Sequence, residues 1–119
     1  MTTAQTGSIK ADITSDAHLT PGEDRTVRWV CKDENGTNIS DFTGWTFAFY
    51  LLPSQRTALT SSDVLLTKTA SSLTAPNIDI TFAVADTSDI TPRAYFYELW
   101  RTDTGNKIRL AYGQFTLID

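Results

Sequence analysis

The side chains that could perform acid–base or nucleophilic chemistry are few and widely spaced. The chain has one histidine, His18, and one cysteine among its 119 residues. His18 stands beside Leu19 and close to Pro21, which indicates an exposed loop histidine and not a catalytic base. Serine nucleophiles lack both a Gly-x-Ser-x-Gly turn and a histidine able to activate them. We therefore predict no catalytic residue, and a small enzyme is the least favoured hypothesis.

Metal and cofactor motifs are missing as well. Cys31 cannot form an internal disulfide, and its strand-like surroundings favour a small buried hydrophobe over a reactive thiol. Residues 33–35 begin like a calcium loop, but Asn38 and Gly44 replace its central glycine and final glutamate, so a turn is favoured. Asp86 is expected to act as the N-cap of a single helical turn. We predict no metal and no cofactor.

The charge balance also excludes classes of partner. The formal net charge is -4, whereas nucleic acids and anionic membranes require a basic patch. The first ten residues lack a basic region followed by an apolar run, so no signal peptide is expected. No stretch approaches the ~20 apolar residues of a membrane span. We predict neither a nucleic-acid nor a membrane partner.

The elements that must position any site are β-strands. Hydrophobic side chains alternate with a period of two, turn residues recur at short intervals, and no sustained helical period is present. About seven strands with this spacing favour an all-β, two-sheet antiparallel sandwich. Residues 1–20 are expected to form an N-terminal arm with a possible first strand, and 21–119 a single sandwich domain. Strands are expected over 8–14, 24–32, 45–52, 64–69, 78–82, 94–102 and 107–118.

The strand expected over 94–102 carries large apolar side chains on both faces. Its odd-numbered residues are the better inward set, because the alternative would bury Glu98. Glu98 then lies either on a solvated face, paired with Arg28 or Arg109, or at the polar rim of an interface.

The last strand carries the inward partners of that set. Ile108, Leu110 and Tyr112 are expected to face the core, opposite the odd-numbered side chains of 94–102. Phe115 has the other parity, so the phase changes along the strand. A β-bulge is predicted at Gly113.

The outward side chains suggest a surface for a partner. If their strands are neighbours, they form an apolar stripe, and a contiguous patch of several hundred Å² usually marks an interface. An alternative is that the N-terminal arm or the loop around 54–62 covers the stripe. The predicted partner-interface residues are Val30, Tyr50, Leu52, Phe96 and Trp100.

An ordered set of elements resembles a module of tailed bacteriophages. The elements are PGEDRTVRWVCKDENG, FTGWTFAFYL and VADTSDITPRAYFYELWRTDTGNKIRLAYGQFTL, which cover most of residues 21–118. They are similar to the N-terminal β-sandwich of phage baseplate upper proteins and related small virion proteins. One departure is that baseplate proteins of that kind continue into a long fibre-bearing region, whereas this sequence ends at Asp119.

The resemblance implies an immunoglobulin-like sandwich with a structural role in the virion and no catalytic residues. It also implies assembly by protein–protein contacts, with itself as a homo-oligomer, expected to be a trimer, and with another virion protein. A capsid decoration (cement) subunit bound to the major capsid protein is favoured, and a tail or baseplate adaptor is the alternative. The implied location is the virion, assembled in the host bacterial cytoplasm. A carbohydrate-binding sandwich stays open as a further alternative, since exposed aromatic rings also stack on sugars.

Overall fold

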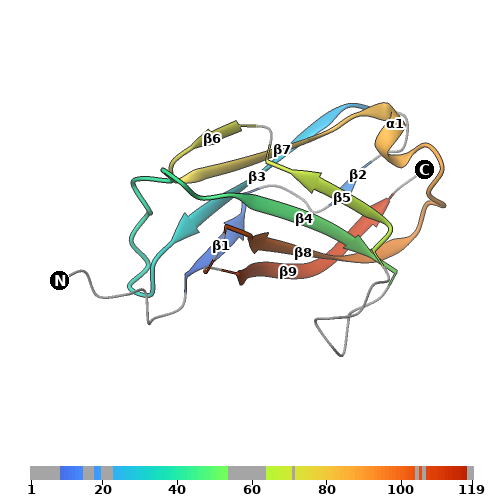
Figure 1. The fold of residues 1–119 in the computed structure, drawn as a ribbon. Helices are drawn as coiled ribbons and strands as arrows, with labels where there is room; N and C mark the ends of the chain where they lie inside the picture. The colour runs from blue at the N-terminus through green and yellow to red at the C-terminus, as the bar shows by residue number, and fades with distance from the viewer. Residues whose placement is uncertain are drawn as a thin grey trace.

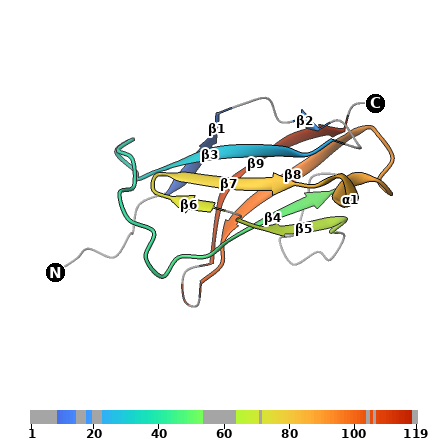
Figure 2. The ribbon, with the colours of Figure 1, turned by 90° about the horizontal axis from the view of Figure 1, so that it is seen from above.

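The chain folds into two β-sheets packed face to face (Figure 1). The computed structural model describes residues 9–14, 18–19, 23–53, 64–70, 72–103, 105 and 107–117. One sheet has the order β1 (Lys10–Ile13), β3 (Arg25–Lys32), β7 (Asn77–Phe82), β6 (Ser72–Thr74). The other has the order β2 (His18–Leu19), β9 (Ile108–Leu117), β8 (Ala94–Arg101), β4 (Phe47–Leu52), β5 (Leu66–Thr69). Seen from above, β3 and β7 lie over β8, β9 and β4, so the predicted two-sheet sandwich is confirmed (Figure 2).

The strand order is that of an immunoglobulin-like sandwich. In that fold one sheet has the order A, B, E, D and the other contains C, F and G. Here β1, β3, β7 and β6 take the first four places, and β4, β8 and β9 take the other three. β5 adds to the C-type edge, and β2 adds to the G-type edge as a parallel neighbour of β9. Between β7 and β8 the chain crosses from the first sheet to the second through α1 (Val84–Thr87), a single helical turn.

The alternation of side chains explains why these segments form strands. In β3, Val27, Trp29 and Cys31 are buried, while the intervening residues are exposed or half-buried. The turn that follows β3 is closed by Asp33, whose carboxylate accepts hydrogen bonds from the backbone N–H groups of Asn35 and Thr37 at 2.9 and 3.0 Å. The segment 33–35 is therefore a turn, as predicted.

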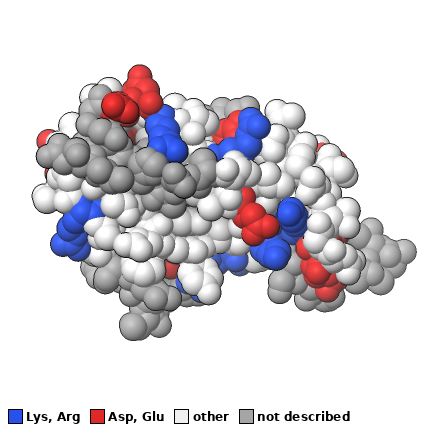
Figure 3. All heavy atoms as spheres, turned by 180° about the vertical axis from the view of Figure 1, so that it is seen from behind, with Lys and Arg blue, Asp and Glu red and all other residues white. Residues whose placement is uncertain are grey.

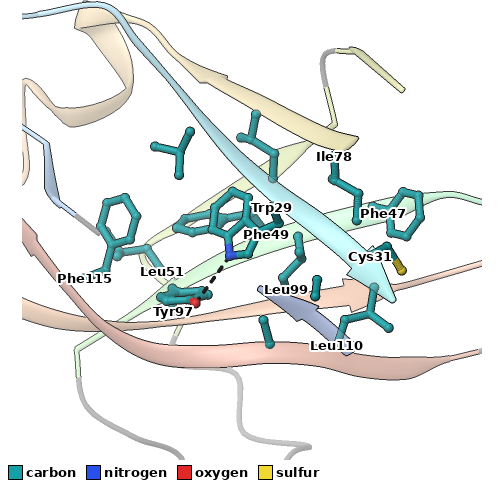
Figure 4. Close-up of a cluster of buried hydrophobic side chains, with 14 of the residues drawn as sticks. Trp29, Cys31, Phe47, Phe49, Leu51, Ile78, Tyr97, Leu99, Leu110 and Phe115 are labelled. Carbon is teal, nitrogen blue, oxygen red and sulfur yellow. Dashed lines mark hydrogen bonds between the residues drawn. The ribbon is translucent and has the colours of Figure 1, made fainter. Parts of the chain in front are cut away.

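An aromatic contact joins the two sheets at the centre of the core. The indole N–H of Trp29 on β3 donates to the hydroxyl of Tyr97 on β8 at 3.3 Å (Figure 4). The rings of Tyr97 and Phe49 stack with centroids 5.8 Å apart and an interplanar angle of 10°. Buried aromatic pairs of this kind add about 0.5–1.5 kcal/mol beyond the area that they bury.

A second feature of immunoglobulin folds fixes the start of β8. The hydroxyl of Tyr95 donates to the backbone carbonyl of Thr91, four residues earlier, which is the geometry of a tyrosine corner. In antibody domains the residue two places after this tyrosine is a cysteine bonded to strand B. Here that place is taken by Tyr97, which meets Trp29 of the B-type strand. A Trp–Tyr pair thus stands where a disulfide would join the sheets.

Several expectations about the elements need correction. Residues 72–74 form β6, where no strand was predicted, and His18 lies in β2, where a loop was predicted. Asp86 is not the N-cap; it is the third residue of α1, and its carboxylate accepts the N–H of Ala83 at 2.7 Å. Most of the predicted arm and the loop at 54–62 lie outside the described residues.

The bulge in the β8–β9 pair lies earlier than predicted. Leu99 pairs with Ala111 and Trp100 pairs with Arg109, so Leu110 is the extra residue. Both Leu110 and Ala111 are consequently buried, and the next residue, Tyr112, turns to the outer face. The expectations that Tyr112 faces the core and that the bulge lies at Gly113 are therefore wrong.

Candidate interaction site on the outer face of the second sheet

The outer face of β4, β8 and β9 brings aromatic side chains together around one carboxylate. Tyr50, Glu98 and Tyr112 are direct neighbours in one row across the three strands. Phe96 and Trp100 lie two residues before and after Glu98, and therefore on the same face of β8. We call the side chains that frame Glu98 the outer aromatic face: Tyr50, Phe96, Trp100 and Tyr112.

Glu98 at the centre of this frame is buried, with 2% of its surface exposed. The indole N–H of Trp100 donates to its Oε1 at 3.0 Å, and Nη1 of Arg109 donates to its Oε2 at 3.3 Å. A buried carboxylate is costly unless it is paired and hydrogen-bonded, and both conditions are met here. The predicted pairing with Arg109 is confirmed, whereas the solvated environment is not, and Arg28 instead pairs with Asp79 on the other sheet.

Arg109 also links the buried carboxylate to the surface. Its guanidinium carbon lies 4.2 Å from the ring centroid of Tyr112. Tyr112 has 57% of its surface exposed, more than any other aromatic side chain among the described residues. The positive charge of Arg109 is thus balanced by Glu98 below and covered on one side by an aromatic ring. The outer aromatic face consequently presents rings and hydroxyl groups with little net charge.

The structure places the residues predicted for the partner interface on two different sheets. Tyr50, Phe96 and Trp100 lie on the outer face and are half-buried, in agreement with the predicted orientation. Leu52 shares that face but has no exposed surface. It is flanked by Phe96 of β8 on one side and, on the other, by the segment entering β5, where the N–H of Leu65 bonds the carbonyl of Leu51. Leu52 therefore offers nothing to a partner.

Val30 does not belong to this surface. It lies on β3 in the opposite sheet, and its outer side faces away from β4 and β8. The predicted stripe therefore loses Val30 and Leu52 and gains Tyr112. Sequence reasoning missed Tyr112 because the bulge at Leu110 reverses the parity of the last strand.

The one thiol of the chain, that of Cys31, lies in the core and not on this surface. Burial raises the pKa of the Cys31 thiol to about 11, although the charge of Arg101 opposes the effect, so this thiol is protonated at neutral pH. Within the described residues, no group of three or more His, Cys, Asp or Glu side chains could hold a metal ion. The predicted burial of Cys31 as a small hydrophobe is confirmed.

The surface charge is mixed. On the side drawn in Figure 3, Lys and Arg side chains lie among Asp and Glu side chains and uncharged atoms, without a continuous basic area. In the part of the chain that is described, no helix combines the length and the hydrophobicity needed to cross a bilayer. The outer aromatic face thus combines aromatic rings with one ion pair, Glu98–Arg109.

The fold and this surface define an immunoglobulin-like β-sandwich with an outward aromatic face. The chain matches no protein-family model and shows no significant match to a curated protein. It is similar to a solved structure of the Pseudomonas fluorescens alkylpurine DNA glycosylase AlkC bound to DNA containing an abasic site analog. The TM-score is 0.44 and the identity 15%, and the match covers 94% of this chain and 30% of that chain. A likeness this distant supports no functional inference.

Proposed function

We propose that this chain is a non-enzymatic structural protein of a tailed-phage virion, which forms a homo-oligomer through the outer aromatic face. The favoured role is a capsid decoration subunit on the major capsid protein. The ordered elements quoted above from residues 21–118 support the phage assignment. The observation that carries the contact surface is the exposed Tyr112 beside a neutralised Glu98–Arg109 pair.

The composition of the outer aromatic face suits a protein partner. Binding hot spots are enriched in Trp, Tyr and Arg and are surrounded by contacts that exclude water. Trp100 and Arg109 both donate to Glu98, and the guanidinium of Arg109 lies over the ring of Tyr112, so these side chains are already held in place before a partner binds. Covering the exposed part of a ring such as Tyr112 contributes about 1–2 kcal/mol per protomer.

Light scattering of the purified chain tests the assembly. The wild-type chain is expected to have the mass of an oligomer, and Trp100→Glu or Tyr112→Ser is expected to reduce it to the monomer mass. Thr26→Glu, an exposed position on the outer side of the other sheet, is the control and should leave the mass unchanged. A monomeric wild-type chain, or oligomers that persist in folded Trp100→Glu and Tyr112→Ser proteins, would refute assembly through this face.

The decoration role and the alternative tail or baseplate adaptor differ in the partner. Purified heads and purified tails of the phage that encodes the chain can be separated and incubated with the labelled protein. Decoration predicts saturable binding to heads, which Tyr112→Ser weakens. Binding to tails alone would favour the adaptor, and binding to neither would contradict a virion role.

A further inference from the structure

Two hollows are lined by residues of the segment that joins β3 to β4 and by Leu73 of β6. That segment lies at the end of the sandwich away from α1 (Figure 1). The larger has a volume of about 340 Å³ and is lined by Asp41, Thr43 and Leu73, among others. The smaller has a volume of about 190 Å³ and is lined by Trp45, Thr69 and again Leu73. Leu73 borders both hollows, so they adjoin at this residue, and we call the two together the groove.

Leu73 marks the place where the edges of the two sheets meet. It lies on the edge strand β6 and pairs with Ile78, whose side chain is fully buried. Its side chain is therefore on the inner side of the sheet, yet 40% of its surface is exposed. An apolar group at an open gap between sheets provides a hydrophobic floor that solvent or a ligand can reach.

Trp45 is held rigidly at one wall of the smaller hollow. The guanidinium carbon of Arg101 lies 3.7 Å from its ring centroid, and Arg101 is itself fixed by two hydrogen bonds to Asp103 at 2.8 and 3.0 Å. Phe42 packs on the same indole, with ring centroids 5.4 Å apart. A fixed aromatic wall costs little conformational entropy when a ligand binds.

Hydrogen-bonding groups border the apolar floor. Asp41 accepts bonds from the N–H and the hydroxyl of Thr43 at 2.9 and 2.6 Å, and these bonds hold the pKa of its carboxyl below the usual range. The hydroxyl groups of Thr46 and Thr102 lie 2.8 Å apart at the other end of the groove. Asp41 is thus ionised at neutral pH and accepts hydrogen bonds only.

No Lys or Arg is among the described residues that line either hollow. An anionic ligand would meet Asp41 without a compensating cation, which disfavours phosphates and acidic polymers. A neutral ligand with one apolar face and several hydroxyl donors matches both halves of the groove.

We propose that this groove binds a neutral oligosaccharide. The C–H groups of a sugar ring would pack on Leu73 and on the part of the Trp45 side chain that borders the smaller hollow, and its hydroxyl groups would donate to Asp41 and exchange hydrogen bonds with the threonine hydroxyls. The groove shares no lining residue with the outer aromatic face, so sugar binding can be tested independently of the proposed assembly.

Titration of the full chain with maltohexaose, cellohexaose and chitohexaose tests the proposal, followed by tryptophan fluorescence and amide NMR shifts. At least one of these sugars is expected to bind, with the largest shifts at Asp41, Trp45 and Leu73. Leu73→Arg should weaken binding at least about tenfold by filling the junction of the hollows. Val84→Arg is the matched control, because Val84 is similarly exposed, at 45%, but lies on α1 at the other end.

Three results would overturn the proposal. They are the failure of all three sugars to bind, shifts confined to residues outside the groove, and unchanged affinity in a Leu73→Arg protein that folds normally by circular dichroism. Tighter binding of polygalacturonate than of any neutral sugar would also contradict it, since the groove would then select an anion. Loss of sugar binding with unchanged oligomer mass would separate this site from the assembly surface.

Discussion

The two faces of β8 bury aromatic side chains in different ways. On the inner face, Tyr97 packs against Trp29 of the opposite sheet and Phe49 of its own sheet. All three rings are buried in the core. On the outer face, Trp100 donates a hydrogen bond to Glu98, Arg109 forms an ion pair with the same carboxylate, and Tyr112 stays exposed. The inner face is complete within the domain, whereas the outer face keeps the ring of Tyr112, on the neighbouring strand β9, exposed. The odd-numbered residues of β8 therefore build the core, and the even-numbered ones support the surface for which we propose contact with a partner.

Removal of the inner contact should have the largest effect. Trp29→Ala deletes a fully buried indole between the sheets, and we expect it to lower the free energy of unfolding by about 3–5 kcal/mol. Trp29→Phe keeps an aromatic ring and should lower the free energy of unfolding by less, because only the hydrogen bond to Tyr97 and part of the packing are lost. Urea denaturation measures both. A cost below about 1 kcal/mol for Trp29→Ala would show that the aromatic contact does not hold the sheets together.

Removal of the Glu98–Arg109 ion pair on the outer face should have the next largest effect on the free energy of unfolding. Arg109→Ala removes a cation that pairs with the buried Glu98, and we expect a loss of about 2–3 kcal/mol, less than for a fully buried pair because Arg109 is partly exposed. Adding Glu98→Gln to Arg109→Ala should recover part of that loss, since the buried negative charge is then gone. A double-mutant cycle by denaturation checks the coupling. Additive effects would contradict a coupled pair.

A smaller effect tests how dry the inner face is. Burial raises the pKa of Cys31 from 9.0 to about 11, so the unfolded chain loses its thiol proton first as the pH rises. The stability from this group is therefore complete below pH 9 and declines as the pH rises towards 11, by about 2 kcal/mol. Burial also raises the pKa of Tyr97, so Cys31→Ala is the control that isolates the thiol. Equal alkaline slopes in both proteins would show that the thiol does not contribute.

The sequence predicted the inner face better than the outer one for a physical reason. Strict alternation in β3 identifies Val27 and Trp29 as core residues, because side chains of a strand alternate between its faces. In β8 both faces carry large apolar side chains, and the place of Glu98 selected the odd-numbered residues as the inward set. The short β6 was missed, since three residues with Ser and Thr carry no period. The sheet to which Val30 belongs depends on long-range pairing, which local patterns do not encode.

The candidate surface was predicted in part. The outward direction of Tyr50, Phe96 and Trp100 followed from parity alone. Tyr112 was misplaced because the bulge at Leu110 has no glycine or proline to mark it, while Gly113, three places on, lies in regular register. The groove at Leu73 could not be predicted, since it needs two sheet edges and a loop to meet.

Hydroxyl-radical footprinting of Tyr112 across a dilution series tests the claim that the outer aromatic face is a contact surface. We predict that Tyr112 is protected from oxidation at concentrations where the chain is oligomeric and becomes reactive as it dissociates. The exposed Val84 serves as the internal reference and should react equally throughout. Equal oxidation of Tyr112 in the oligomer and in the monomer would contradict the account.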